Sequence, residues 1–209
     1  MLKKRYSELN FEAGCDEAGR GCLAGPVVAA AVILPKNHSL NSLNDSKKLS
    51  AGVREQLASE IKLKALCWAV GIVDAAEIDA INILNASFLA MHRAIKELRQ
   101  KPELLLIDGN RFNPYQNIKH QCIIKGDSKF MSIAAASVLA KTYRDDFMKK
   151  MALSFPHYHW NTNMGYPTKK HREAISKHGV SPIHRLTFQL LPEQLKLETL
   201  PDHLQFSGL

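Results

Sequence analysis

The segment FEAGCDEAGRGCLAGPVVAAAVIL, residues 11–34, decides the fold of this 209-residue chain. It holds two strand-like runs, Phe11 to Cys15 and the apolar stretch Gly25 to Leu34, and the second is bounded by Gly-Pro and by Pro35. A third run, Ala65 to Val73, has the same character. Three early strands of this kind indicate an antiparallel meander.

The remaining sequence alternates helical and strand patterns. Leu104 to Ile107 is short and fully apolar, which is typical of a buried parallel strand. A stripe of apolar residues at helical spacing precedes it and predicts a helix that ends before Pro102. The stripe consists of Leu84, Phe88, Met91, Ile95 and Leu98. The other expected elements are a loop from Asn37 to Ser50, a weak helix from Arg54 to Lys64, a strand from His120 to Ile124, a long helix from Ser128 to about Met151 and short helices beyond Pro156.

These elements predict an α/β fold in which helices cover a mixed sheet. A chain of 209 residues fits one domain. We expect its core to span about residues 11–151 and a C-terminal helical extension, about residues 152–209, to pack on that core.

The composition is that of an ordinary globular protein, with 45% hydrophobic and 23% charged residues. The N-terminal residues do not look like a secretion signal, and the longest apolar run, Val27 to Leu34, is shorter than the roughly 20 residues that span a bilayer. We therefore expect a cytoplasmic protein with no membrane association, and a monomer by default. The four cysteines lack C-x-x-C spacing, which favours reduced thiols over a zinc or redox site.

The positive charge is concentrated in one half of the chain. The net charge is +8, and residues 119–185 hold twelve Lys and Arg against four Asp and Glu. An excess of this kind favours a polyanionic partner such as nucleic acid, and the alternative is a basic surface that is only solvated.

Asp16 and Glu17 directly follow the first strand-like run. Adjacent carboxylates repel each other, and a divalent cation relieves that repulsion because hard cations prefer carboxylate oxygen. If Asp16 ends the strand, one carboxylate points into a cleft while its neighbour follows the turn. The alternative is a solvent-exposed acidic turn.

Gly19, Arg20 and Gly21 strengthen the functional interpretation. Flanking glycines let a backbone approach a phosphate closely, and arginine adds a planar bidentate donor. The spacing Gly19-x-Gly21-x-x-Ala24 also matches a dinucleotide fingerprint, which requires a helix directly after the glycines. Gly25-Pro26 begins a strand instead, so we reject that site; a P-loop sequence is absent.

Two further carboxylates stand at element boundaries. Asp108 closes the apolar run that ends at Ile107, and ligands bind beyond the carboxyl ends of strands in α/β sheets. The alternative is an ordinary turn residue. Asp127 lies at the entry to the long helix, where either it or Ser128 is a good N-cap candidate, so the sequence alone does not separate a cap from a metal ligand.

Lys47 and Tyr166 are candidate contacts to nucleic acid. Lys47 lies in a loop with small hydroxyl side chains, which suits phosphate contact, although a solvated turn fits equally. Gly165 and Pro167 flank Tyr166 and indicate a rigid turn. Its ring is suited to stacking on a sugar or base or to hydrogen bonding a 2′-hydroxyl, and the alternative is a buried anchor for the extension.

In order and sequence these motifs resemble the ribonuclease HII family. The resemblance covers about residues 11–188, with no departure at a motif position. It rests on Asp-Glu-Ala-Gly-Arg-Gly at 16–21, Gly-Pro-Val-Val-Ala-Ala at 25–30, Asn-Asp-Ser-Lys-Lys-Leu at 44–49, Ile-Asp-Gly at 107–109, Lys-Gly-Asp-Ser at 125–128, Ser-Ile-Ala-Ala-Ala-Ser at 132–137 and Gly-Tyr-Pro at 165–167.

The resemblance implies a ribonuclease H-like fold, a five-stranded mixed sheet flanked by helices, with a C-terminal helical extension. It implies an endonuclease that hydrolyses the RNA strand of RNA/DNA hybrids. The same enzyme would cut on the 5′ side of ribonucleotides embedded in duplex DNA, leaving 5′-phosphate and 3′-hydroxyl ends by a two-metal-ion mechanism. Asp16, Glu17, Asp108 and Asp127 would bind Mn²⁺ or Mg²⁺; Gly19, Arg20 and Gly21 would grip the RNA–DNA junction and Tyr166 would sense the ribose.

Two other hypotheses about the function are compatible with the sequence. A non-catalytic nucleic-acid-binding module would use the acids only as caps and turns, and nucleotide-dependent phosphoryl transfer lacks a motif. Gln194 to Leu197 loosely resembles a peptide that docks on sliding clamps, but Glu198 stands where an apolar residue is wanted, so an ordinary amphipathic helix is favoured.

Overall fold

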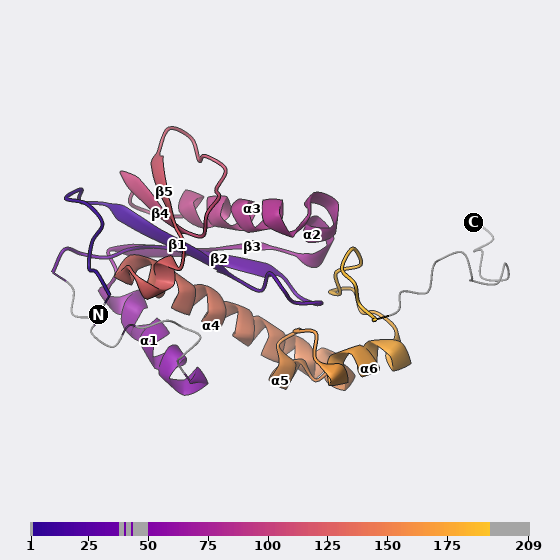
Figure 1. Cartoon of the computed structure of the whole chain (residues 1–209). Helices are drawn as coiled ribbons and strands as arrows, with labels where there is room; N and C mark the ends of the chain where they lie inside the picture. Colours follow the sequence, from indigo (N-terminus) through magenta and orange to yellow (C-terminus); the bar gives the residue numbers. More distant parts are fainter. Residues whose placement is uncertain (1, 38–39, 41–42, 44–49, 193–209) are drawn as a thin grey trace.

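The computed structural model describes residues 2–37, 40, 43 and 50–192. Its sheet has five strands in the order β3-β2-β1-β4-β5, which confirms the predicted mixed sheet (Figure 1). β1, β2 and β3 form the antiparallel meander, and β4 and β5 continue it in parallel with β1. The strands are β1 Glu12–Ala18, β2 Val27–Ile33, β3 Cys67–Val73, β4 Leu104–Asp108 and β5 Lys119–Ile123.

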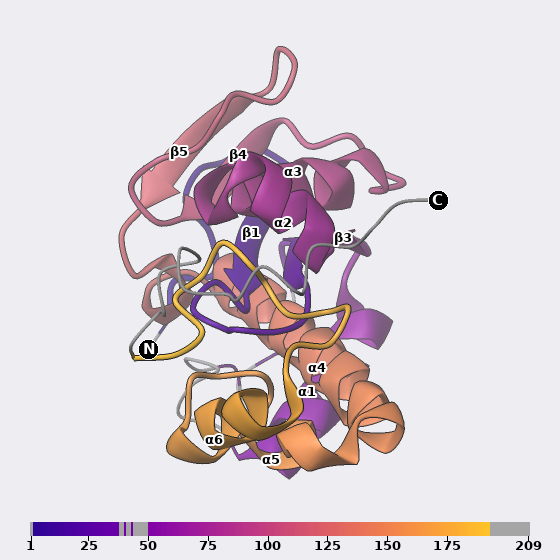
Figure 2. The ribbon, with the colours of Figure 1, turned by 90° about the vertical axis from the view of Figure 1, so that its right-hand side faces the viewer.

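Helices cover both faces of the sheet (Figures 1 and 2). α2 (Ala75–Ile81) and α3 (Ile83–Lys96) lie on one face, and α4 (Met131–Ser154) lies on the other with α1 (Ala51–Lys64) beside it. Because successive side chains of a strand point to opposite faces, β2 is apolar throughout and serves both layers. Ala31 packs in the same cluster as Met91 of α3, whereas Val32 packs with Leu139 of α4.

The predicted helix before Pro102 is confirmed as α3, which carries the apolar stripe except for Leu98, a residue just beyond its end. Phe88, Met91 and Ile95 are buried against the sheet. The helix is preceded by a separate short one, α2, and the two are divided at Asn82, whose side chain accepts hydrogen bonds from the first turn of α3.

β1 is longer than the sequence predicted. The strand runs through the acidic pair to Ala18, because Asp16 and Glu17 pair with Ala30 and Ala29 of β2. The predicted strand from Phe11 to Cys15 is therefore too short at its C-terminal end: backbone pairing with β2 outweighs the poor strand tendency of two adjacent acids.

The start of α4 also differs from the prediction. The helix begins at Met131, its N-cap residue is Phe130, and a 3₁₀ turn, η2 (Gly126–Ser128), precedes it. Neither Asp127 nor Ser128 is therefore the N-cap of this helix. α4 crosses β1 closely at Gly14, where an added Cβ would lie 2.2 Å from the carbonyl carbon of Ser132.

Short helical elements follow α4 in the described part of the expected C-terminal extension. It contains η3 (Pro156–Tyr158), α5 (Trp160–Asn163) and α6 (Lys169–His178), and its core includes the buried Tyr158 and Trp160. The extension packs on the segment after β1: Leu23 N–H donates to Gly165 O at 2.8 Å. None of the helices in the described part of the chain is long and apolar enough to span a membrane.

Candidate active site

Three of the predicted acidic residues meet where the central strands end. Asp16 lies in β1, Asp108 is the last residue of the parallel neighbour β4, and Asp127 lies in η2. One carboxylate oxygen from each lies within 4.8 Å of the others. The Asp108 Oδ1 accepts a hydrogen bond of 2.6 Å from Gly126 N–H, which ties the Asp127 turn to the end of β4.

The like charges of this cluster are held at an energetic cost. Burial raises the pKa of the Asp16 carboxyl well above its ordinary value, and the charges of Glu17 and Asp108 raise it further. A hydrogen bond with the Ser137 side chain and one from the Glu17 N–H, 2.7 Å from Oδ1, act in the opposite direction. The ionised cluster therefore needs a positive charge for compensation.

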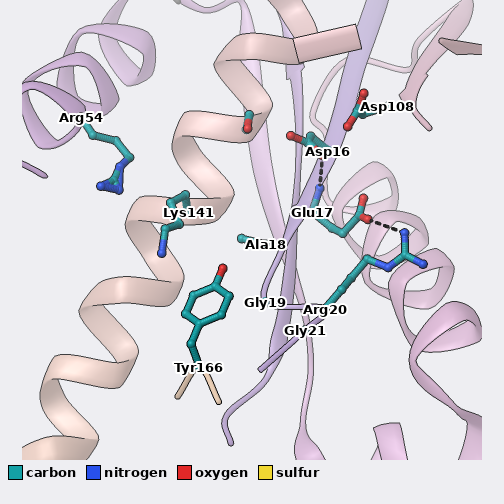
Figure 3. A pocket seen from close by; sticks show the side chains of 11 residues that line it. Asp16, Glu17, Ala18, Gly19, Arg20, Gly21, Arg54, Asp108, Lys141 and Tyr166 are labelled. Carbon is teal, nitrogen blue, oxygen red and sulfur yellow. Dashed lines mark hydrogen bonds and ion pairs between the residues drawn. The ribbon is translucent and has the colours of Figure 1, made fainter. Parts of the chain in front are cut away.

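Glu17, the fourth predicted ligand, is directed differently. Its Oε1 forms an ion pair of 3.3 Å with Arg20 Nη1 (Figure 3). Its Oε2 is buried and has no hydrogen-bond partner among the described residues. Burial raises the pKa of Glu17, and the Arg20 charge lowers it. A buried carboxylate oxygen without a donor, beside three clustered carboxylates, fits the all-oxygen ligand set of a hard divalent cation.

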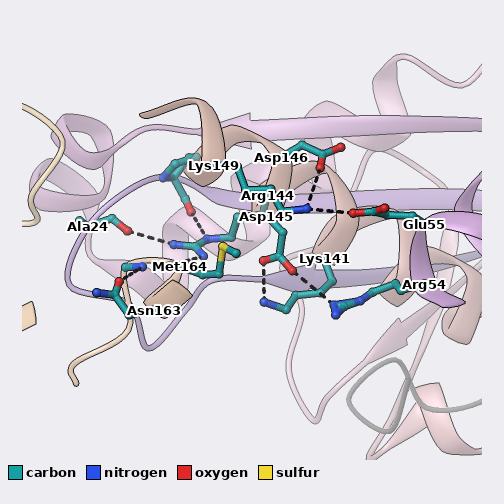
Figure 4. A network of polar contacts seen from close by, with 12 residues as sticks. Ala24, Arg54, Glu55, Lys141, Arg144, Asp145, Asp146, Lys149, Asn163 and Met164 are labelled. Atoms are coloured by element: carbon teal, nitrogen blue, oxygen red, sulfur yellow. Dashed lines mark hydrogen bonds and ion pairs between the residues drawn. The ribbon is translucent and has the colours of Figure 1, made fainter. Parts of the chain in front are cut away.

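The Gly-Arg-Gly loop, residues 19–21, is fixed by a buried arginine. Gly19 adopts φ +97°, and a Cβ there would lie 2.1 Å from Arg144 Nε. Arg144 is fully buried and donates to Pro26 O at 2.9 Å, Ala24 O at 2.9 Å and Met164 O at 2.8 Å (Figure 4). Glycine is thus required at position 19 by the fold itself, whereas a Cβ at Gly21 would meet no described atom within 4 Å.

A second buried arginine secures the same loop from the C-terminal extension. Arg185 donates to Arg20 O at 2.9 Å and to Gly25 O at 3.0 Å. Burial lowers the pKa of this guanidinium to about 10, and the charge of Arg144 contributes. Sequence reasoning counted both arginines as surface charge. A signal was present for one: Arg144 stands midway between Ala140 and Met148, on the fully buried side of α4.

Tyr166 faces the cleft and is not a buried anchor. Its side chain is 39% exposed, whereas Tyr158 and Trp160 fill the core of the extension. The Tyr166 hydroxyl shares a hydrogen bond with the Cys22 thiol, and Lys141 Nζ lies 5.4 Å from the centre of its ring. Burial of the hydroxyl raises the pKa of Tyr166.

These residues line one cleft of about 570 Å³ (Figure 3). The structure thus brings Asp16, Glu17, Asp108, the Gly-Arg-Gly loop and Tyr166 into one cleft, and Asp127 adjoins it beside Asp108. Lys47 lies outside the described residues. Four lining residues were not among the predicted site residues: Ala18, Arg54, Ser137 and Lys141. The full set is Asp16, Glu17, Ala18, Gly19, Arg20, Gly21, Arg54, Asp108, Ser137, Lys141 and Tyr166.

A five-stranded mixed sheet with helices on both faces and carboxylates where its central strands end defines a nuclease of the ribonuclease H-like fold. Solved structures agree. The ribonuclease H2 of Pyrococcus horikoshii has a TM-score of 0.71 and 27% identity over 86% of this chain and 94% of its own. A PCNA:RNase HII complex from Archaeoglobus fulgidus has a TM-score of 0.71 and 28% identity over 88% of this chain and 98% of its own.

The sequence comparisons narrow the class to one family. The family model described as ribonuclease HII matches residues 13–191. A curated relative from Parabacteroides distasonis, named ribonuclease HII, is 65% identical over 197 residues, which cover 94% of this chain and 99% of that protein. The chain belongs to the ribonuclease HII family. It is therefore an endoribonuclease, which favours the hydrolase over the non-catalytic binding module.

Proposed function

We propose that this chain hydrolyses the RNA strand of RNA/DNA hybrids and cuts on the 5′ side of ribonucleotides embedded in duplex DNA. The observation that carries the proposal is the convergence of Asp16, Asp108 and Asp127 within 4.8 Å. They line or adjoin the same cleft as the Gly-Arg-Gly loop and Tyr166. The expected products are a 5′-phosphate and a 3′-hydroxyl.

Asp16, Glu17, Asp108 and Asp127 would hold Mn²⁺ or Mg²⁺. In a two-metal site such ions supply an activated water and neutralise charge at the attacking and leaving oxygens. The acids' own contribution is to place the carboxylates of Asp16, Glu17 and Asp108 in the wall of the cleft, with the carboxylate of Asp127 beside them. Ser137 and Gly126 fix the orientation of two of them, Asp16 and Asp108.

The remaining residues would position the substrate. Gly21 leaves the loop open to close approach by a phosphate, because no described side chain occupies that space. The Arg20 guanidinium is half exposed and suited to a phosphate oxygen. Tyr166, held by Cys22 at its hydroxyl, would sense the 2′-hydroxyl of the ribonucleotide.

The decisive test is cleavage of an end-labelled DNA duplex that contains one ribonucleotide. All-DNA duplex and a long RNA/DNA hybrid serve as comparison substrates, each with Mg²⁺, Mn²⁺ or chelator. A single metal-dependent cut on the 5′ side of the ribonucleotide supports the proposal. Cutting of the hybrid alone would overturn the roles given to the Gly-Arg-Gly loop and Tyr166, and no cutting of either would overturn the nuclease.

The role of the acids as metal ligands is tested with one variant and one matched control. Asp16→Asn removes one carboxylate of the cluster, and we expect cleavage to fall by roughly 10³-fold, the scale of losing a major electrostatic contact in an active site. Asp146→Asn makes the same chemical change on the exposed side of α4 and should leave the rate unchanged. Substantial cleavage by Asp16→Asn with duplex binding intact would refute the ligand assignment.

A sliding-clamp contact is a second, separate proposal. The Archaeoglobus fulgidus neighbour was solved as a PCNA:RNase HII complex, and that complex supports it. The tail segment from Gln194 to Leu197 lies outside the described residues. Capture by an immobilised clamp should be lost when residues 190–209 are deleted, and unchanged capture would end the proposal.

A further inference from the structure

Two histidines of the C-terminal extension are buried and have no part in the site described above. They are His171 of α6 and His184, and their Nε2 atoms lie 3.2 Å apart. Burying an imidazole is costly unless its nitrogens have hydrogen-bond partners. Both nitrogens of each ring have a partner, which calls for an explanation beyond packing.

The hydrogen bonds fix the position of the proton on each ring. Ser181 N–H lies 2.8 Å from His184 Nδ1, so that nitrogen accepts and the neutral ring carries its proton on Nε2. Trp160 Nε1–H, which is only a donor, lies 3.0 Å from His171 Nε2. His171 therefore carries its proton on Nδ1, which donates to Tyr166 O at 2.9 Å. Burial lowers the pKa of both histidines, which keeps the rings neutral.

These groups form one directed chain of hydrogen bonds. Ser181 donates to His184, whose Nε2–H donates to His171 Nε2. The His171 Nδ1–H then donates to the Tyr166 carbonyl. The two proton assignments come from different donors and agree on the direction of the bond between the rings. The chain therefore ends at the backbone of the turn whose side chain faces the cleft.

His184 also belongs to the segment that fixes the Gly-Arg-Gly loop. Its neighbour Arg185 donates to the carbonyl of Arg20 at 2.9 Å. Arg185 thus contacts the loop directly, whereas His184 contacts the Tyr166 turn through His171. The loop and Tyr166 line the same cleft (Figure 3). Two adjacent residues are therefore connected to both of the elements that would hold the substrate.

We propose that His171 and His184 are positioning residues that set the place of Tyr166 relative to the Gly-Arg-Gly loop. The inference rests on the proposed function, in which the loop grips the backbone and Tyr166 senses the 2′-hydroxyl beside it. Because both contacts fall on one stretch of substrate, the spacing between loop and tyrosine decides whether both are made together. The two histidines act on the reaction only through the Tyr166 backbone.

The competing explanation is that the two rings only fill the core of the extension. The centre of the His184 ring lies 4.8 Å from that of Tyr158 and 5.5 Å from that of Trp160. An apolar side chain would fill such a space without needing a partner for each nitrogen. Packing alone predicts that the effect of a His171 substitution on cleavage does not depend on the residue at position 166.

The experiment is a double-variant cycle on the full-length protein. It compares kcat and KM of the unsubstituted protein, His171→Leu, Tyr166→Ala and the variant with both changes, on the duplex with one ribonucleotide. His171→Leu should lower kcat roughly tenfold with little change in KM, since a misplacement of about 1 Å costs up to roughly 10²-fold. In the Tyr166→Ala background it should have no further effect, because the side chain that it positions is gone.

Three further variants separate positioning from folding, with kcat divided by the folded fraction that denaturation curves give. His171→Asn places an amide N–H near the position of Nδ1–H and should recover most of the rate lost in His171→Leu. His178→Leu makes the same change at the exposed end of α6 and should match the unsubstituted protein. If His171→Leu does not fold, His171→Gln takes its place in the cycle, because it keeps a polar group near Nε2 but lacks the donor at Nδ1.

The outcomes distinguish this inference from the proposed function. An equal loss of kcat from the His171 substitution in both backgrounds, or no loss in either, would refute the positioning role and leave the nuclease standing. If Tyr166→Ala cuts as fast as the unsubstituted protein, the role of Tyr166 is overturned and this inference with it. An unsubstituted protein that cuts neither the duplex nor the hybrid would refute the proposed function itself.

Discussion

The two sides of the cleft are held in opposite ways. The strand side, which holds the clustered acids, gathers like charges, so that burial and mutual repulsion raise the pKa of Asp16. The other side, formed by the Gly-Arg-Gly loop and the Tyr166 turn, is fixed by two buried arginines, Arg144 and Arg185, which donate to backbone carbonyls. The clustered acids therefore suit a bound cation but lower the stability of the folded protein without one, whereas the buried arginines stabilise the fold. Substitutions should therefore reduce activity on one side and stability on the other.

The largest stability effect is expected at Arg144. Arg144→Gln removes a charged donor from three buried carbonyls and should lower the free energy of unfolding by roughly 3–5 kcal/mol. Chemical denaturation measures it, with Lys149→Gln as the control on the same helix, because an exposed ion pair contributes about 0–1 kcal/mol. The Asp16→Asn variant should behave differently: with chelator present, its free energy of unfolding should be at least as large as that of the unsubstituted protein. A marked loss of stability there would break the comparison.

The side of the cleft that holds the Tyr166 turn should also lose stability in acid. His171 Nδ1 lies 2.9 Å from Tyr166 O, and its Nε2 lies 3.2 Å from His184 Nε2. Burial lowers the pKa of His184 from 6.5 to about 4, so the folded state favours the neutral ring. The associated stability is present above about pH 6.5 and is lost as the pH falls towards 4, by up to roughly 3 kcal/mol.

Denaturant midpoints between pH 7 and pH 4 measure this loss. His184→Gln should be less stable at pH 7 but should show a flatter pH profile, since the titrating ring is gone. An unchanged profile in this variant would assign the acid sensitivity to other groups.

The smallest stability effect is expected at Gly21. A Cβ there meets no described atom, so Gly21→Ala should change the free energy of unfolding by no more than about 0.5 kcal/mol. Cleavage should nevertheless fall, because the methyl group enters the space left for the substrate backbone. Gly19→Ala should behave in the opposite manner, since φ +97° and the Arg144 contact make that position strained for any other residue. Equal stabilities of the two variants would contradict the distinction.

Much of the sheet could be predicted because its strands are apolar and bounded by clear turn residues. β2 and β4 follow directly from Gly25 to Leu34 and Leu104 to Ile107. The extension of β1 through Asp16 and Glu17 could not be predicted, since it depends on the pairing of these residues with Ala30 and Ala29 of β2. The start of α4 was missed for a related reason: the Asp127 turn is held by a hydrogen bond between Gly126 and Asp108, which no local pattern reveals.

The candidate site divides in the same way. The convergence of Asp16 and Asp108 follows from parallel strands ending at one edge, and the position of Asp127 came from the family resemblance. The interior arginines and the Arg54–Asp145 contact were missed because they join residues 91 to 165 positions apart. Long-range contacts of this kind leave no periodic signal in the sequence.

One of those contacts has a consequence for biosynthesis. Arg185 donates to the carbonyl of Arg20, a residue 165 positions earlier in the chain. A ribosome therefore delivers all four acids long before it delivers the donor that locks the Gly-Arg-Gly loop. The growing polypeptide therefore holds all four acids before the loop beside them is fixed, and the cleft is complete only after Arg185 has been synthesised.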